Sequence, residues 1–456
     1  MTRELTGVIV LTAGYTTVGA AVLYGIGLLR TVRQSLRLMG LAIIVGWVLT
    51  GIGLSLALAI GLSVSVVTTG ALWAVIAVLA FLGGRVLPPF PLRAARSEQT
   101  LVGRSIALVG AGLLAVDLTA LAWRSANPSG QLHADVWNFW LPKAKTIYFF
   151  DGLDTGVGGF TSQTSPDYPP LVPALEALTF TFAGGADVLA LPLAHWAVAV
   201  AFFGALAGLL RERVRPAILW PALAMLAFMP MLARLIGSSL ADEPLALLYA
   251  LAGVCSALWL LDRDWRMAAL GSVFLVAATL TKNEGLMLSL ALALVVALVA
   301  RRRPVVPLLI AGGPLLAFLA WKGWLSQHGV PPNYAYSFDD LLRPGYLAGR
   351  VDRFEYGAIE LLKQLFSPSK WLLTAPLALV LAGALARVRP GLSALVLATP
   401  ALAFLGYAAV YWISSVELHF YVDNNVERVV APIVLFLGAL FPLLFAEAFE
   451  RSQEAP

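Results

Sequence analysis

The residues best suited to chemistry lie in polar segments that interrupt long apolar runs. The stretch from 133 to 173 is the first long segment too polar to lie in lipid, and it carries Asp135, the first plausible catalytic acid, among aromatic residues and two lysines. Elsewhere the chain is mostly apolar, with 59% hydrophobic and 12% charged residues. Ionisable side chains that take part in a reaction should therefore gather in such loops, because burying them in lipid is costly.

Two shorter patterns place charges where helices should begin or meet. Asp242 and Glu243 precede a proline that suits a first helical turn, which puts both acids near the positive end of a helix dipole. Capping of that helix accounts for one of the two acids. Lys282 and Glu284 lie in a Thr-Lys-Asn-Glu-Gly turn between two apolar runs, where unpaired charges would be costly. We expect them to face each other or a polar ligand.

Arg428 opens the last apolar run of the chain. A guanidinium fixed at a membrane surface can hold a phosphate through two parallel hydrogen bonds. The structural alternative is that the side chain reaches out to lipid headgroups.

The apolar runs predict an all-α polytopic membrane protein with about thirteen spans, in which short interfacial helices occupy a large outer loop. A helix of roughly twenty apolar residues crosses a hydrocarbon core of roughly 30 Å. The charge-free stretch 38–83 is too long for one crossing, so we divide it near residues 61–65. The other predicted spans are 7–29, 105–123, 190–210, 217–236, 243–261, 267–281, 285–300, 305–325, 371–386, 391–412 and 429–446.

The arginines indicate how the chain is oriented in the cytoplasmic membrane. If the N-terminus starts outside, every short arginine-rich loop falls inside, as the positive-inside rule requires. The tail 447–456 is then cytoplasmic, and the long polar loops 124–189, 326–370 and 413–428 face the periplasm or the cell exterior. All the residues singled out above share that outer face. Outer loops are also polar simply because they are wet, which is the alternative explanation for any single residue among them.

Composition excludes two classes of site. The net charge of +5 would suit nucleic acid in a soluble domain, but the arginines lie in short loops between apolar runs, where they anchor topology, so we expect no nucleic-acid partner. The single cysteine, Cys255, lies in an apolar run and excludes an intrachain disulfide or a cysteine-based metal site.

Taken together, the motifs resemble those of the bacterial branch of the GT-C glycosyltransferases, multi-helix membrane enzymes that include the protein O-mannosyltransferases and the lipid A aminoarabinose transferases. In that superfamily the first large outer loop begins with an acid just after a helix and ends in a Tyr- or His-Pro-Pro-Leu turn, similar to Asp135 and the turn 168–171. The bacterial branch adds tryptophans and a Lys-Ala-Lys stretch, which resemble Trp137, Trp140, Lys143 and Lys145.

The later motifs follow in the family's order. Asp242 with Glu243 resembles the second acidic motif, Lys282 the lysine-containing outer turn, and Arg428 the arginine that opens a late helix. The chain departs from the family after Arg428, where Val-Val-Ala-Pro replaces a tyrosine or leucine followed by proline. The resemblance covers 105–446 as a catalytic transmembrane module, and the helices of 1–104 are additional to the simplest members.

The resemblance implies an inverting glycosyltransferase that moves a hexose or pentose from a polyprenyl-phosphate carrier to a hydroxyl of a glycan, lipid or protein at the outer membrane face. Asp135 is the expected base, and Lys282, Arg428, Lys143 and Lys145 are expected to bind the donor phosphate. The residues expected to contact substrate are Trp137, Trp140, Asp167, Tyr168, Asp242, Glu243 and Glu284. An interfacial aromatic belt explains the aromatic members equally well. We expect no cofactor, with a divalent cation at Asp242 and Glu243 as the alternative.

Two other functions compete with this interpretation. A transporter or flippase for a lipid-linked or anionic substrate would favour broken helices, charges at the bilayer midplane and an internal repeat. No repeat is visible in the sequence, and most charges lie at the ends of the apolar runs. A non-catalytic assembly subunit is the third alternative, and in it Asp135 would be replaceable.

Overall fold

The structure is a computed structural model that describes residues 2–89, 96–98, 100–127, 132–300, 305–331 and 337–449. Within these residues every regular element is a helix. The first half contains α1 (Thr2–Gly25), α2 (Val32–Arg37), α3 (Met39–Ala59), α4 (Val66–Val86), α5 (Leu101–Ala126), η1 (Val136–Trp140), α6 (Leu141–Phe150), η2 (Phe160–Ser162), α7 (Leu171–Ala183), α8 (Ala190–Leu210), α9 (Pro216–Ala227) and α10 (Pro230–Gly237). The second half contains α11 (Asp242–Asp262), α12 (Trp265–Thr281), α13 (Glu284–Val299), α14 (Val305–Gln327), η3 (Phe338–Leu342), α15 (Pro344–Ala348), α16 (Val351–Leu365), α17 (Pro368–Trp371), α18 (Thr374–Ala384), α19 (Pro390–Ile413), α20 (Leu418–Val429) and α21 (Ala431–Phe449).

The described helices agree with a polytopic membrane protein. Nine are long and apolar enough to cross a bilayer, with α20 and α21 counted as one, and the bent pair α9 and α10 would make a tenth. The predicted break near residues 61–65 is confirmed, because α3 ends at Ala59 and α4 begins at Val66. The predicted spans 267–281, 285–300 and 371–386 correspond to α12, α13 and α18, which are helical but shorter than the other candidates, so a count of thirteen is not confirmed.

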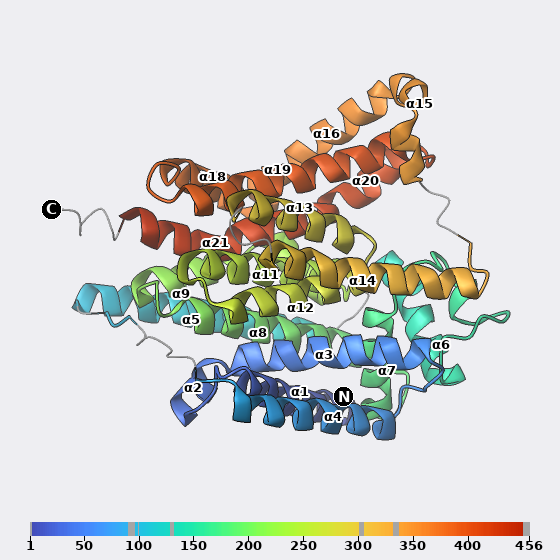
Figure 1. The fold of residues 1–456 in the computed structure, drawn as a ribbon, viewed down its shortest axis with the longest axis horizontal. Helices are drawn as coiled ribbons and strands as arrows, with labels where there is room; N and C mark the ends of the chain where they lie inside the picture. Colours follow the sequence, from blue (N-terminus) through green and yellow to red (C-terminus); the bar gives the residue numbers. More distant parts are fainter. Residues whose placement is uncertain are drawn as a thin grey trace.

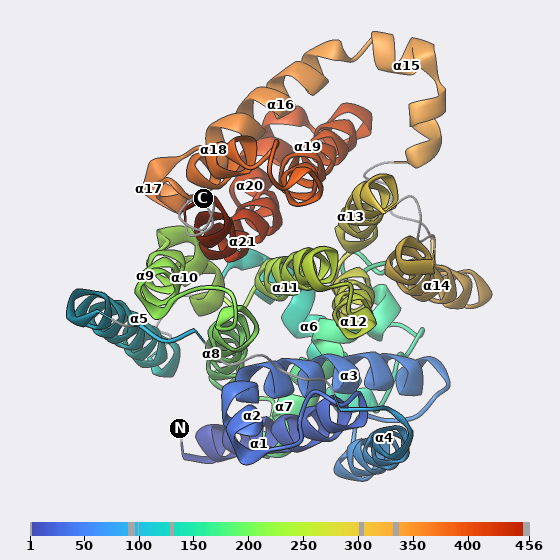
Figure 2. The same cartoon turned by 60° about the vertical axis from the view of Figure 1, so that its left-hand side comes forward.

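Helix α11 lies at the centre of the bundle. In Figure 2 the N-terminal helices α1–α4 (blue) and the C-terminal helices α16–α21 (orange to red) lie on opposite sides of it, and it packs against α8, α10, α12, α13, α19 and α21. Of its apolar stretch 94% is buried, against 6% for α4 at the edge. A helix that is apolar all round, such as α11, belongs in such a central position.

The short helices gather at one end of the bundle, which we call the loop-bearing end. Helices α6 and α15 lie there, whereas α2 and the C-terminus lie at the opposite end (Figure 1). The expected loops 124–189 and 326–370 do contain short helices, although their segments 128–131 and 332–336 lie outside the described residues. Most of the expected tail 447–456 also lies outside them, because the description stops at Phe449.

The N-terminal helices pack closely against the remainder of the chain. Helix α1 contacts α3, α4, α7 and α8, and α3 contacts α7, α8 and α12. Small residues permit this approach: a Cβ on Gly19 would lie 1.7 Å from the carbonyl oxygen of Ala42, and one on Gly46 would lie 1.9 Å from that of Tyr15. Glycine at a helix interface lets two backbones meet, as is common between membrane helices.

Replacing Gly46 by alanine should therefore destabilise the bundle. The added methyl group overlaps the α1 backbone, and overpacking of this kind costs about 1–3 kcal/mol. Gly70 on α4 provides the matched control, since nothing lies within 4 Å of a Cβ built there. Thermal unfolding of the purified protein should show a lower midpoint for Gly46→Ala only, and equal midpoints for the two variants would contradict the close packing.

Candidate functional site

The acidic and basic side chains singled out in the sequence come together near the loop-bearing end, although they are far apart in the chain. Asp135 directly precedes η1, and Asp242 is the first residue of α11. Lys282 and Glu284 flank the break between α12 and α13, and Arg428 lies in the last turn of α20.

The five side chains just named are joined by successive ion pairs. We call this series the charged row. A guanidinium nitrogen, Nη1, of Arg428 lies 2.6 Å from a carboxylate oxygen of Asp135 and 3.5 Å from one of Asp242. The Nζ of Lys282 lies 2.9 Å from the other oxygen of Asp242 and 3.6 Å from Glu284. Anionic and cationic groups thus alternate from Asp135 to Glu284, as buried charges require.

The charged row is most accessible at Asp135, while Glu284 at its other end is 16% exposed. The side chain of Asp135 is 29% exposed, whereas those of Asp242 and Arg428 are 4% and 8% exposed. The Nε of Arg428 is buried and has no hydrogen-bond partner. A ligand that displaces Asp135 from Arg428 would therefore find an unsatisfied donor, Nε, on the same guanidinium.

Local sequence explains how the two inner positions are fixed. Asp242 begins α11 next to a proline in the first turn, with its acid near the helix N-terminus. Lys282 has an extended backbone that ends α12, and α13 begins two residues later. A Cβ on Gly285 would lie 2.1 Å from the carbonyl oxygen of Ala278, so only glycine permits this tight contact between the two helices.

Asp135 introduces a π-helical turn, η1, which carries both tryptophans of the motif. Turns of π-helix are rare in proteins overall, but those that occur are often found at functional sites. Trp140 is buried and packs edge-on against Tyr168, with their ring centroids 5.6 Å apart. Trp137 is 51% exposed. Of the predicted aromatic contacts, Trp137 is therefore free to meet a ligand, while Trp140 and Tyr168 pack the loop.

Asp167 ties the loop to the helices behind it. One of its carboxylate oxygens accepts a hydrogen bond from Nδ2 of Asn283 at 2.8 Å and lies 3.3 Å from Nζ of Lys322. Its carbonyl oxygen accepts a hydrogen bond from Nε1 of Trp321 at 2.8 Å. The contacts of Asp167 thus position the loop beside the turn that holds Lys282.

The two lysines of the Lys-Ala-Lys stretch are not part of the charged row. Lys143 is 1% exposed, donates to the carbonyl oxygen of Ser165, and lies 5.1 Å from the ring centroid of Phe160. Burial lowers the pKa of Lys143 to about 7. Lys145 is half-buried on the same helix. Lys143 holds the loop together, and of the four residues expected to bind phosphate, Lys282 and Arg428 belong to the charged row.

Glu243 points to a different part of the molecule from its neighbour Asp242. Its side chain is fully buried, and its Oε2 pairs with Nδ1 of His195 on α8. Successive residues of a helix differ by about 100° in direction, which separates the two acids although they are adjacent in the chain. Among the described residues no three His, Cys, Asp or Glu side chains are grouped as a metal site would need.

Three further polar residues contact the site residues, and of these only Asn283 belongs to a motif noted in the sequence. Asn425 accepts a hydrogen bond from Nη2 of Arg428 at 2.7 Å, and its spacing of three residues on α20 is the signal that could have found it. Nδ1 of His133 accepts a hydrogen bond from the backbone of Asp135 at 3.1 Å. Asn283, the third, reaches Asp167 as described.

Electrostatics favours a neutral His133 and a charged Lys282. Burial, followed by the nearby Arg428, lowers the pKa of His133, which fits its role as an acceptor. Burial alone would lower the pKa of Lys282, but the carboxylates of Asp242 and Glu284 outweigh it and raise the pKa. The positive charge of Lys282 is therefore maintained at neutral pH.

The pKa of Lys143 predicts how stability changes with pH. Between pH 7 and 10 the unfolded state keeps this lysine protonated while the folded state loses the proton, so the wild type should gain stability with rising pH. Lys143→Met should lack that gain, whereas the exposed Lys363→Met should keep it. Unfolding midpoints measured across this range check the difference, and parallel curves for wild type and Lys143→Met would contradict it.

Comparisons with known proteins bear on the resemblance drawn from the motifs. No family model matches the chain, and no curated protein or solved structure matches it. Membership of the GT-C superfamily stays a prediction, and the chemistry has to be argued from the site itself.

Proposed function

We propose that the protein is a membrane glycosyltransferase that moves a sugar from a polyprenyl-phosphate carrier to a hydroxyl acceptor at the outer membrane face. The observation that carries the proposal is the pairing of Asp135 with Arg428, in which the most accessible carboxylate of the charged row touches a buried guanidinium. In this proposal α12, α13 and α18 also cross the membrane, which gives thirteen spans with the N-terminus outside and the C-terminus in the cytoplasm.

The residues of the charged row suit each part of the reaction. Asp135 takes the proton of the acceptor hydroxyl, and the oxygen forms a bond to the anomeric carbon of the sugar. The bond between that carbon and the phosphate oxygen breaks, and its electron pair stays on the phosphate. Arg428 and Lys282 stabilise the charge that develops there. A single displacement of this kind inverts the configuration of the anomeric carbon.

The contact between Asp135 and Arg428 also suggests an order of events. A carboxylate that is bound to a guanidinium is a poor base, because the cation stabilises its ionised form. A phosphate that binds Arg428 would compete with Asp135 for the same donors, and the unsatisfied Nε offers it a further hydrogen bond. Donor binding would thus free Asp135 for the acceptor. Trp137, exposed beside it, is placed to stack on a sugar ring.

One observation favours the transporter alternative. Helices α9 and α10 are bent by 61° at a short break, and α10 leads directly into the start of α11 at the charged row. Transporters use broken helices of this kind at their binding sites. Proteoliposomes loaded with a fluorescent polyprenyl phosphate distinguish the two functions, because a flippase moves the lipid between leaflets without any acceptor and a transferase does not.

Asp135→Asn should abolish transfer and leave donor binding nearly intact. The amide cannot take the acceptor proton, and loss of a general base costs about a hundredfold or more in rate. Transfer is measured by mass spectrometry as loss of a lipid-linked sugar incubated with the protein and membrane acceptors. Asp154→Asn, an exposed acid of the same loop, is the control. A near wild-type rate for Asp135→Asn would refute its role as the base.

Arg428→Gln and Lys282→Met should weaken binding of a polyprenyl phosphate by about tenfold or more each, because each removes a charged hydrogen-bond donor. Arg234→Gln is the matched control, since this arginine pairs with Glu427 and its side chain is 60% exposed. Affinity is measured with decaprenyl phosphate in lipid nanodiscs. Unchanged affinity in both variants would exclude the charged row as the phosphate site.

A further inference from the structure

A second polar site lies deeper in the bundle, on the other side of the first turn of α11. A cavity with about 610 Å³ of space between atoms, its open mouth included, lies among α1, α3, α7, α8 and the start of α11. Most of its lining is apolar, as at Leu11, Ile43 and Val198. Helices α1 and α3, which have no part in the charged row, form one wall of it.

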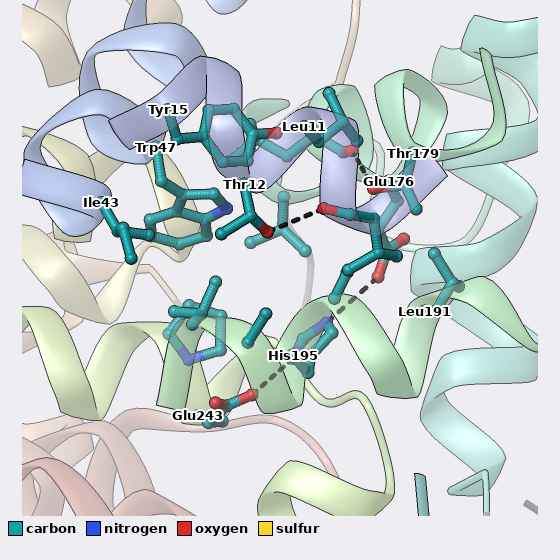
Figure 3. Close-up of a pocket in the computed structure, with 17 residues that line it drawn as sticks. Leu11, Thr12, Tyr15, Ile43, Trp47, Glu176, Thr179, Leu191, His195 and Glu243 are labelled. Atoms are coloured by element: carbon teal, nitrogen blue, oxygen red, sulfur yellow. Dashed lines mark hydrogen bonds and ion pairs between the residues drawn. The ribbon is translucent and has the colours of Figure 1, made fainter. Parts of the chain in front are cut away.

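A histidine between two glutamates lies in this cavity (Figure 3). Nδ1 of His195 pairs with Glu243, and its Nε2 lies 3.7 Å from a carboxylate oxygen of Glu176. The side chains of Glu176 and His195 are only 5% and 9% exposed. Three ionisable groups in an apolar surrounding are costly unless something else neutralises or binds them.

The unused hydrogen-bonding capacity of these residues is on the acceptor side. Neither carboxylate oxygen of Glu176 has a hydrogen-bond partner, and Oε1 of Glu243 has none. The hydroxyls of Thr12 and Thr179 already donate to backbone carbonyls of their own helices, at 2.7 and 2.9 Å. An occupant must therefore bring donors.

The charges of the residues that line the cavity also favour an occupant that donates hydrogen bonds. Two carboxylates face one imidazole, so the lining carries a net negative charge when all three are ionised. No lysine or arginine is among the residues that line the cavity, all of which the structure describes. The rings of Tyr15 and Trp47 also line it, and aromatic faces favour a cation. These features together fit a positively charged group with several N–H donors.

We propose that this cavity binds the primary ammonium group of a small amphiphile. The three N–H donors would satisfy the open oxygens of Glu176 and Glu243, and the positive charge would balance the second carboxylate. The apolar lining at Leu11, Ile43 and Val198 would hold the attached hydrocarbon. This proposal is independent of the transferase reaction.

The mouth of the cavity indicates that the amphiphile comes from the lipid. Thr12 on α1 and Ala194 and Ala197 on α8 line the cavity and are partly exposed, whereas the glutamates are not. Both helices are candidate membrane spans, so an opening between them leads to the hydrocarbon phase. Amphiphiles concentrate there with the charged group near the surface.

The test compares hexylammonium with hexanol, which has the same chain and no charge. Binding to the full-length protein in phosphatidylcholine nanodiscs is measured by calorimetry at pH 7, after subtraction of binding to empty nanodiscs. The ammonium should bind at least tenfold more tightly than the alcohol. Equal affinities would overturn the proposal, and this comparison requires no variant.

Variants then locate the binding site. Glu176→Gln should weaken hexylammonium binding by about tenfold or more, because the amide keeps the shape and loses the charge. Glu360→Gln, on α16 and outside the cavity lining, is the control and should bind as the wild type does. Thr12→Leu narrows the mouth without removing a carboxylate and should also weaken binding. Wild-type affinity in both Glu176→Gln and Thr12→Leu would place the ammonium elsewhere and refute the cavity as its site.

Affinity for decaprenyl phosphate is measured in parallel, so that failure of this proposal is distinguished from failure of the transferase proposal.

Discussion

The buried carboxylate of Asp242 is the constraint on which the arrangement of the site depends. A lone carboxylate at the start of the most buried helix would be strongly destabilising, and two cations from distant parts of the chain neutralise it. The ion pair with Lys282 places the break between α12 and α13 beside Asp242, and the ion pair with Arg428 places α20 there. Because Arg428 also holds Asp135, the first loop is attached to the same point. One desolvated charge thus determines where four separate segments meet.

The first turn of α11 serves two chemically different sites. Asp242 faces two cations and Glu243 faces an imidazole, although they are neighbours in the chain. The N-terminal helices α1 and α3 wall only the second site. Without them, Glu176 and His195 would lose part of the apolar lining that buries them, and exposed or unpaired charges there would change the stability of the bundle. The N-terminal helices therefore help to bury this triad.

Sequence reasoning predicted much of the fold, and the structure brings several of the expected site residues together. The helix positions, the break between α3 and α4 and the pairing of Lys282 with a neighbouring acid could be predicted because they depend on local hydropathy and charge. The partnership of His195 with Glu176 and Glu243 could not, because His195 and Glu176 each lie alone in an apolar run and only packing brings them to Glu243. The resemblance of the Lys-Ala-Lys stretch groups Lys143 with the expected phosphate ligands, whereas in the structure its buried ammonium group donates to the carbonyl of Ser165 in its own loop. The bent pair α9 and α10 and the shorter helices α12, α13 and α18 account for the difference between the thirteen spans expected from hydropathy and the nine long helices among the described residues.

A reaction at this site must also keep the total charge of the buried groups balanced. The charged row holds three carboxylates and two cations, so it is negative before any anionic lipid arrives. In the proposed transfer, the phosphate gains one negative charge when its bond to the sugar breaks. Asp135 loses one negative charge in the same step, because it takes the proton of the acceptor. The total charge within the low-dielectric site then stays constant through the transition state, which avoids a large reorganisation of the surroundings. An acceptor without an ionisable proton would leave the extra charge uncompensated, so the row favours a hydroxyl that gives up its proton as the sugar is transferred.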